Sequence, residues 1–366
     1  MKPLKAVGIH VFAGLFTAGV KSAGFDIVEM LEDGKFGQAT HKLNFPEIPI
    51  SDDVASWPVE LLRSANIDLV FSNSPCAGLS VANSSRGADN PINQALEHSC
   101  ATALRIQPQI YVVESVSALF TDGAPMVERW ERAWQTAGYN TCRLLESAEH
   151  LGLPQVRKRA IFIAARSGIQ LARPLADAPP VTVRQAIEDL STAPLDWAPQ
   201  PYTTHATHAY ARKARLDSLQ LTHHLHGNVS KAIASIVPHL GQGQRADSLS
   251  EEVIDATYRR NRLHPVKPDG RPSLLFRRLA WDKPSVVITG GAHWFHPEHN
   301  RLLTVREQAR LMGVPDWFRF SGNIAASYAE LGKAVSPIVG GWLANQLACL
   351  LRAPLSSSSH QAEISL

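Results

Sequence analysis

A cysteine follows a short apolar segment in the first quarter of the chain. Cys76 lies in Ser74-Pro75-Cys76-Ala77-Gly78, directly after the apolar residues 67–71. If residues 67–71 form a strand, this turn exposes the thiol at the strand's carboxyl end, where exposure and backbone donors favour the nucleophilic thiolate. Cysteine is also among the residues most often buried in cores. From its own surroundings, Cys76 is either a nucleophile or a structural core residue.

An acidic residue ends another apolar segment. Glu114 follows residues 109–113 in Val112-Val113-Glu114-Ser115-Val116. A half-buried carboxyl at a strand end has a raised pKa and can hold a proton for transfer. A helix N-cap or a surface acid is the alternative.

Three long polar side chains alternate along a third segment. In Gln155-Val156-Arg157-Lys158-Arg159 the spacing places Gln155, Arg157 and Arg159 on one face of an extended chain. Such a face suits a planar, anionic ligand such as a nucleotide. A solvated basic patch is the alternative.

The elements that must position these residues follow from the apolar pattern. Short apolar strands that alternate with helical stretches predict an α/β fold with a doubly wound, mostly parallel sheet. Because ligands of such sheets bind at the carboxyl ends of the strands, we expect the three features to meet at one edge. The strands are expected at residues 6–12, 25–31, 67–71, 109–113 and 159–164, with helices at 91–105 and 125–137.

The pattern changes after about residue 167, where Pro and then His become frequent and a basic, turn-rich stretch runs from Arg259 to Arg278. Helical spacing resumes at residues 304–312 and 335–351. Gly290-Gly291 predicts a turn able to approach a nucleic-acid groove. We therefore expect a first domain at 1–180, a smaller irregular domain at 181–324, a returning segment at 325–355 and a disordered tail at 356–366.

Composition excludes several classes of protein. The 366 residues carry 36 Lys and Arg against 33 Asp and Glu, a net charge of +3 that is too mild for a polycation. Four cysteines without C-x-x-C spacing predict neither a zinc ribbon nor a disulfide framework, and no metal site is expected. No transmembrane helix or signal peptide is predicted, so the expected location is the cytoplasm.

Taken in order, the motifs resemble those of the DNA cytosine-5 methyltransferases over about residues 6 to 345. Pro75-Cys76 resembles the nucleophile motif, Glu114-Ser115-Val116 the family's Glu-Asn-Val, and Gln155-x-Arg157-x-Arg159 its Gln-x-Arg-x-Arg. The segment from Arg301 to Asp316 resembles the ninth motif. Phe12-Ala13-Gly14 is similar to the opening cofactor loop, and Gly332-Lys333-Ala334-Val335 to the last motif, Gly-Asn-Ala-Val.

The resemblance implies a SAM-dependent methyltransferase of Rossmann-like fold that acts on a flipped-out cytosine. Cys76 would add to carbon 6 and Glu114 would bind ring nitrogen 3 and the amino group. Arg157 and Arg159 would contact the base and orient the cysteine loop, which Gln155 would support. Residues 80–93 are a candidate for the mobile loop that closes over the base.

The same resemblance implies the cofactor residues. Glu32 follows the second strand, where the family's acid holds the ribose, and Asp53-Val54 lie where the family contacts the adenine. A surface acid is the alternative for each carboxylate. The complete set of expected cofactor contacts is Phe12, Ala13, Gly14, Leu15, Glu32, Asp53, Val54, Pro75 and Lys333.

Four departures from the family pattern concern the site. His10-Val11 precedes Phe12 where the family has Asp, the first loop is about two residues short, and Ser115 replaces Asn. Lys333 replaces an Asn beside the sulfonium, where a second cation is a like-charge contact. Lys333 is therefore expected either to turn into water, with S-adenosylmethionine as donor, or to pair with the carboxylate of carboxy-S-adenosylmethionine and so permit carboxymethyl transfer.

The expected partner is double-stranded DNA, read by the basic second domain of a monomeric enzyme. A separate restriction endonuclease is a further expected partner, since the chain has no nuclease domain of its own, and no membrane is involved. Two alternatives stay open: a catalytically silent DNA-binding relative, which would have no reason to keep Cys76 and Glu114, and a transfer-RNA cytosine methyltransferase of the same fold.

Overall fold

The computed structural model describes residues 2–353 apart from 33, 36, 53, 55–56, 81–84, 170, 172–177 and 261–275. Four expectations therefore fall wholly or partly outside the described residues. They are Asp53 as an adenine contact, part of the candidate mobile loop at 80–93, the tail at 356–366, and much of the basic segment between Arg259 and Arg278.

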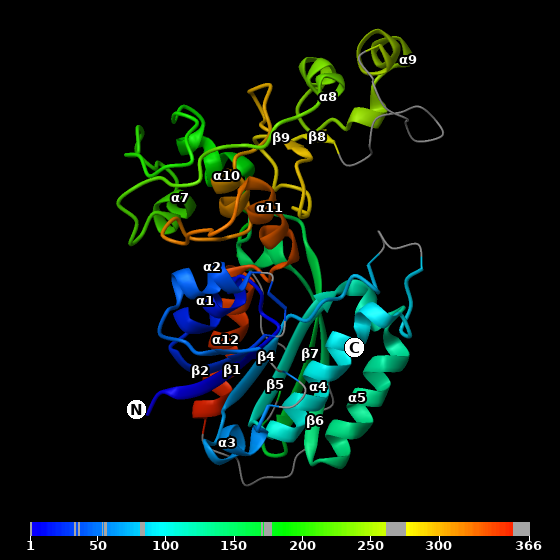
Figure 1. The fold of residues 1–366 in the computed structure, drawn as a ribbon, viewed down its shortest axis with the longest axis vertical. Helices are drawn as coiled ribbons and strands as arrows, with labels where there is room; N and C mark the ends of the chain where they lie inside the picture. Colours follow the sequence, from blue (N-terminus) through cyan, green and yellow to red (C-terminus); the bar gives the residue numbers. More distant parts are fainter. Residues whose placement is uncertain are drawn as a thin grey trace.

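A seven-stranded sheet forms the centre of the lower part of the molecule in Figure 1. Its order is β3-β2-β1-β4-β5-β7-β6, and β7 runs antiparallel to both of its neighbours while the pairs from β3 to β5 are parallel. The doubly wound, mostly parallel sheet is confirmed. The strands are β1 (Leu4–Ile9), β2 (Phe25–Leu31), β3 (Ile50–Ser51), β4 (Leu69–Ser72), β5 (Ile110–Val116), β6 (Tyr139–Ser147) and β7 (Lys158–Arg166).

Helices cover both faces of the sheet (Figure 1). The apolar side chains of α1 and α12 share one core with one face, and those of α3, α4 and α5 share a second core with the other. Gly19 of α1 lies so close to α12 that a Cβ there would be 2.6 Å from the Pro337 carbonyl oxygen. These helices are α1 (Leu15–Ser22), α2 (Gln38–Asn44), α3 (Val59–Ser64), α4 (Gln94–Ile106), α5 (Ala124–Thr136) and α12 (Pro337–Arg352).

Strand β3 was not predicted, and two further differences from the predicted strands have identifiable reasons. The first strand ends at Ile9 rather than residue 12, because His10 and Phe12 adopt positive φ angles of 53° and 50° and turn the chain over the sheet edge. Strand β6 was not predicted, because it lies at the sheet edge and alternates buried with exposed residues instead of forming an apolar run.

Residues 181–324 consist mainly of short elements above the sheet (Figure 1). Val183 of α6 and Val305 of α10 belong to the same core as α1 and α12, whereas residues of α8, α9 and β9 form a separate core. The elements are α6 (Val183–Ile187), α7 (Ala209–Ala214), α8 (Lys231–Ile236), α9 (Glu251–Ile254), β8 (Arg277–Arg278), β9 (Trp294–Phe295) and α10 (Val305–Leu311), and α11 (Ile324–Lys333) follows.

Single helical turns connect several of these elements. They are 3-10 turns at Pro91–Asn93, Ser117–Phe120, Ala148–Leu151, Glu188–Leu190, Val237–His239 and Ala246–Ser248, and a π turn at Asp255–Arg259.

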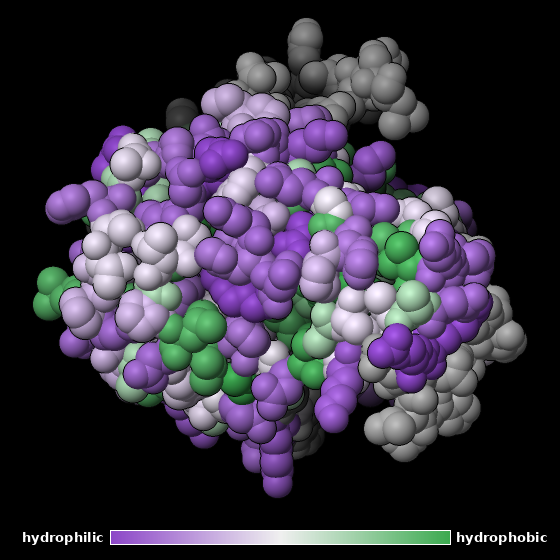
Figure 2. Space-filling model, turned by 90° about the horizontal axis from the view of Figure 1, so that it is seen from above, coloured by the Kyte–Doolittle hydropathy of each residue, from purple (hydrophilic) through white to green (hydrophobic). Residues whose placement is uncertain are grey.

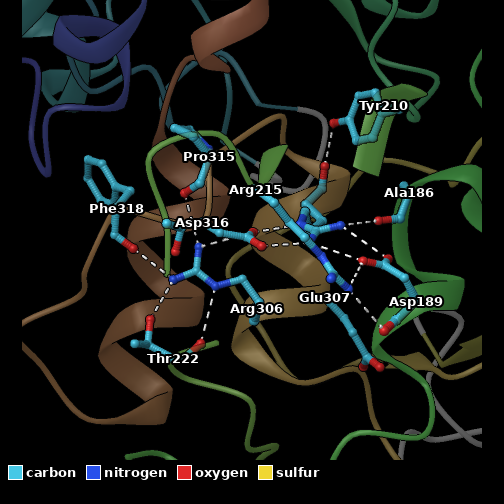
Figure 3. Close-up of polar contacts among 12 residues, drawn as sticks. Ala186, Asp189, Tyr210, Arg215, Thr222, Arg306, Glu307, Pro315, Asp316 and Phe318 are labelled. Carbon is cyan, nitrogen blue, oxygen red and sulfur yellow. Dashed lines mark hydrogen bonds and ion pairs between the residues drawn. The ribbon is translucent and has the colours of Figure 1, made fainter. Parts of the chain in front are cut away.

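Helix α10 joins the second region to the sheet and is buried along its whole length. Two of its arginines have no exposure to water, and their partners come from residues far apart in the sequence (Figure 3). Arg310 pairs with Asp316 and Asp189, and Arg306 donates to the carbonyl oxygens of Thr222, Pro315 and Phe318. Buried charges require such partners, so these contacts hold together segments of the second region that are far apart in the sequence.

One helical stretch, Ile324–Arg352, meets the length and composition of a membrane span, but 56% of its apolar window is buried inside the molecule. It contains two helices, α11 and α12, separated at residues 334–336. Packing of α12 against α1 accounts for its apolar residues.

The surface on the side of the second region is mainly hydrophilic, with apolar residues in small patches on the face drawn in Figure 2. The exposed leucines of this region include Leu195, Leu216 and Leu219.

Candidate active site

Cys76 lies in the turn that follows β4. The chain is buried from Ser72 to Ser74 and becomes half-exposed at Pro75 and Cys76, and Cys76 packs in part against the core that contains α4 and α5. The Cys76 carbonyl oxygen accepts from Leu79 N at 3.0 Å, which closes the turn. Ser74 Oγ shares a hydrogen bond of 3.0 Å with His10 Nδ1, so the turn is also held by the end of β1.

Glu114 and Arg159 form an ion pair across neighbouring strands. Because β5 and β7 are antiparallel, with Val116 opposite Arg159 and Glu114 opposite Ile161, the two side chains meet diagonally. Arg159 Nε lies 2.8 Å from Glu114 Oε1, and Asn73 Nδ2 donates to Glu114 Oε2 at 3.2 Å. Burial raises the pKa of Glu114 to about 7, although the Arg159 charge opposes the rise. At neutral pH this carboxyl can therefore hold or release a proton.

Gln155 and Arg157 contact a different part of the molecule. Gln155 Nε2 donates to the Leu311 carbonyl oxygen, and Gln155 Oε1 accepts from Ile288 N, both at 3.1 Å. Arg157 donates to the carbonyl oxygens of Ile288 at 3.1 Å and Ala334 at 3.3 Å. Among the described residues, these side chains thus join the start of β7 to α10 and α11. The family resemblance had implied a different contact, with the Cys76 turn.

The expected cofactor loop lies one strand away. Glu32, at the end of β2, is 3% exposed, and its carboxylate accepts from Phe12 N at 3.0 Å and Gly34 N at 3.1 Å. Gly14 precedes α1 with a φ of 88°, and a Cβ on Gly37 would be 2.5 Å from Ala13 N. Two closely packed loops and a buried carboxylate, which can accept about four hydrogen bonds, fit a ligand with a vicinal diol such as ribose.

The other expected cofactor contacts differ in the exposure of their side chains. The side chains of Ala13, Leu15 and Val54 are buried in the two cores, so only their backbone atoms face the loop. Phe12 and Pro75 are half-buried.

Lys333 is the exposed last residue of α11. One turn earlier, the buried Glu330 accepts from Thr40 Oγ1 of α2 at 2.9 Å, and burial raises the pKa of Glu330 to about 6. Residues three apart lie near the same face of a helix, so Lys333 lies near the face of α11 that contacts α2.

The predicted glycine turn at 290–291 packs closely against α11. A Cβ on Gly332 would lie 1.9 Å from Gly290 N, so the two backbones touch. This contact requires a glycine at position 332, while Gly290 itself is exposed and its approach to a nucleic-acid groove stays a prediction.

Two polar residues of the site were not predicted. Asn73 contacts Glu114, and His10 contacts Ser74 beside the cysteine turn. Both directly follow strands, and both are at most 4% exposed. The sequence signal that could have identified them is a polar residue placed between an apolar strand and a candidate motif.

Comparisons with known proteins agree with this arrangement. Residues 8–349 match the family model of the C-5 cytosine-specific DNA methylases. The Type II methyltransferase M.XorII of Xanthomonas oryzae is 28% identical over 95% of this chain and 86% of its own length. M1.HphI of Haemophilus parahaemolyticus is 29% identical over 89% of this chain and 82% of its own length.

Solved structures share the fold. A protein described as a DNA modification methyltransferase encoded within an Escherichia coli prophage has a TM-score of 0.76 at 22% identity, covering 96% of this chain and 100% of its own. The Dnmt2 methyltransferase of S. pombe has a TM-score of 0.56 at 15% identity, with the same coverage of both chains.

The raised pKa of Glu114 predicts a pH-dependent stability. The folded chain holds the Glu114 proton more tightly than the unfolded chain does, so this contribution is fully present below the ordinary pKa of 4.5 and is lost as pH rises through about 7. Between about pH 4 and pH 8 the free energy of unfolding should fall in the natural protein by about 3 kcal/mol relative to Glu114→Gln.

Chemical denaturation across this pH range measures the difference. Glu60→Gln, at an exposed position on α3, is the control and should run parallel to the natural protein. Parallel curves for Glu114→Gln would contradict the prediction.

Proposed function

The chain belongs to the family of C-5 cytosine-specific DNA methylases, and we propose that it transfers a one-carbon group to carbon 5 of a flipped-out cytosine through a covalent adduct with Cys76. The observation that carries the proposal is a buried carboxyl–guanidinium pair on β5 and β7, next to the strand β4 whose following turn contains the half-exposed Cys76. Asn73 joins the two, since it contacts Glu114 and lies three residues before Cys76.

The chemistry of these residues is complementary. The Cys76 thiolate adds to carbon 6 while Glu114 donates a proton to ring nitrogen 3, and carbon 5 becomes the nucleophilic carbon of an enamine. Transfer of the one-carbon group to carbon 5 would leave the donor as a neutral thioether. Loss of the carbon-5 proton to a base in solution then restores the double bond between carbons 5 and 6 and expels the Cys76 thiolate, and ring nitrogen 3 returns its proton to the Glu114 carboxylate. Arg159 keeps Glu114 in place and stabilises the carboxylate that remains after proton donation.

The residues present fit a sulfonium cofactor of the S-adenosylmethionine type. Bound beside α1, this group supplies an electrophilic carbon. Glu32 would hold the ribose hydroxyls, and the backbone from Phe12 to Leu15, with Val54 and Pro75, would line the rest of the site.

The Cys76 assignment predicts a covalent product. DNA that carries 5-fluorocytosine at the target should trap the natural protein, because fluorine cannot leave as a proton does, and Cys76→Ala should neither trap nor turn over. Trapping is measured on denaturing gels.

A second cysteine provides the control. Cys100 is buried against Trp134 and burial raises the pKa of its thiol to about 12, so Cys100→Ala should trap normally. Trapping by Cys76→Ala, with Cys100 or Cys142 as the attacking residue, would contradict the assignment.

We propose double-stranded DNA as the substrate of a cytoplasmic, monomeric enzyme whose companion is a separate restriction endonuclease. Two observations support this: Cys76, Glu114 and Arg159 are all present, and the matched relatives are Type II methyltransferases. The first argues against a catalytically silent relative. Competition between duplex DNA and transfer RNA would separate this substrate from an RNA target.

The strand β8 offers a specific candidate for a DNA contact. Its two arginines point to opposite faces of the strand. Arg278 is buried and donates to carbonyl oxygens that include those of Leu240, Val237 and His296. Arg277 is half-buried, and among the described residues no group accepts a hydrogen bond from its guanidinium. A partly desolvated cation without an acceptor suits a phosphate or a guanine edge.

Replacement of Arg277 by Ala is therefore expected to weaken DNA binding. If Arg277 contacts a phosphate, binding to every sequence should weaken, and the slope of the logarithm of the binding constant against the logarithm of salt concentration should fall in magnitude by about one. If it contacts a base, sequence preference should relax at one position. The matched control is Arg259→Ala, because Arg259 is already paired with Glu251 and Asp255. Unchanged affinity and preference in Arg277→Ala would place the DNA contact elsewhere.

Lys333 favours a second candidate function, carboxymethyl transfer from carboxy-S-adenosylmethionine. Its exposed position at the end of α11, one turn after the residue that contacts α2, is the supporting observation. An ammonium next to a sulfonium is a repulsive contact, whereas an ammonium next to the carboxylate on the transferred carbon is a charge-assisted pair. The product would be 5-carboxymethylcytosine.

Lys333→Asn should change the choice of donor. Loss of one charge-assisted pair is worth about 1.5 to 3 kcal/mol, hence a shift of roughly 10- to 100-fold toward methyl transfer. Both donors are offered together, and nucleosides of the digested DNA are compared by mass spectrometry. Only 5-methylcytosine from the natural protein, at every donor ratio, would exclude the carboxymethyl reaction.

A further inference from the structure

Asn73 occupies an enclosed position between β4 and the cysteine turn. It is 4% exposed, and its backbone N–H donates to the Ile9 carbonyl oxygen at 3.4 Å. The side-chain nitrogen donates to Glu114 Oε2 at 3.2 Å. Asn73 therefore contacts a group that the proposed reaction uses, from the same chain segment that carries Cys76.

The other end of this amide is not satisfied. Among the described residues, the Asn73 side-chain oxygen is buried and has no hydrogen-bond partner. Buried acceptors in folded proteins almost always receive a hydrogen bond. An acceptor without one next to a candidate site therefore indicates that a bound ligand supplies the missing donor.

We propose that Asn73 is a specificity-determining residue, whose amide nitrogen positions Glu114 and whose amide oxygen accepts a hydrogen bond from the exocyclic amino group of the target cytosine. This inference rests on the proposed function, because it names a contact with the base on which Cys76 would act.

The chemistry of the base matches this pair of groups. Cytosine presents ring nitrogen 3, an acceptor, beside its amino group, a donor. Glu114 in its protonated form donates to the ring nitrogen, and the neighbouring Asn73 oxygen accepts from the amino group. Uracil or thymine would place a carbonyl oxygen against the Asn73 oxygen, and two facing acceptors repel. The same amide thus selects cytosine over the other pyrimidines.

Asn73 also affects the proton on Glu114. A donor on Oε2 stabilises the ionised carboxylate, so its removal favours the protonated form. In Asn73→Leu, which keeps a side chain of similar size without polar atoms, the pKa of Glu114 should rise by about one unit or more above that of the natural protein.

Infrared difference spectroscopy of the free protein measures this titration through the carboxyl band that is absent in Glu114→Gln. The control is Ser72→Ala, because the equally buried Ser72 hydroxyl contacts Tyr111 instead of Glu114. The control should titrate like the natural protein. An unchanged pKa of Glu114 in Asn73→Leu would overturn the positioning role. This test does not depend on whether the chain modifies cytosine.

The contact with the base is tested by binding. In a Cys76→Ala background, where no adduct forms, duplexes that carry cytosine at the target are compared with duplexes that carry pyrimidin-2-one, which lacks the amino group. The Asn73→Leu change should weaken binding of the cytosine duplex about 10-fold and leave the other nearly unchanged. Equal losses for both duplexes, or none, would overturn the proposed contact.

Discussion

The two arginines of α10 that are wholly removed from water set the constraint on which the site depends. Burial of a guanidinium without partners has a high free-energy cost. Arg306 and Arg310 can therefore be buried only when residues from several segments supply acceptors for them. The carbonyl oxygen of Leu311, at the end of α10, accepts from Gln155. The helix that closes the second region onto the sheet therefore also fixes the start of β7, and β7 carries Arg159 into the site.

The site itself balances two opposing effects on one carboxyl. Removal from water favours the neutral acid of Glu114, while the Arg159 charge favours the ionised form. The result is a pKa near 7, at which either protonation state is accessible with little free energy. A more exposed glutamate would be ionised at neutral pH and could not donate a proton to the base. A buried glutamate without a cationic partner would have a pKa too high for it to release its proton readily.

Much of this architecture was predictable from local patterns. The apolar segments led to the correct sheet class, and Cys76 and Glu114 were expected at the edge where they lie. The destinations of Gln155 and Arg157 were not predictable, because spacing shows which face a side chain shares but not which distant backbone it meets. Asn73 escaped notice for the same reason: its partner is 41 residues away in the sequence. The backbone contact of Gly290 with Gly332 likewise requires the tertiary fold.

The central claim is that the chain modifies carbon 5 of cytosine in DNA. Nucleoside mass spectrometry of DNA from cells that express it tests this most directly, with cells that express Cys76→Ala as the reference. The account predicts a 5-substituted cytosine, methyl or carboxymethyl, that is present with the natural protein and absent from the reference. DNA with the same nucleoside composition in both would contradict it.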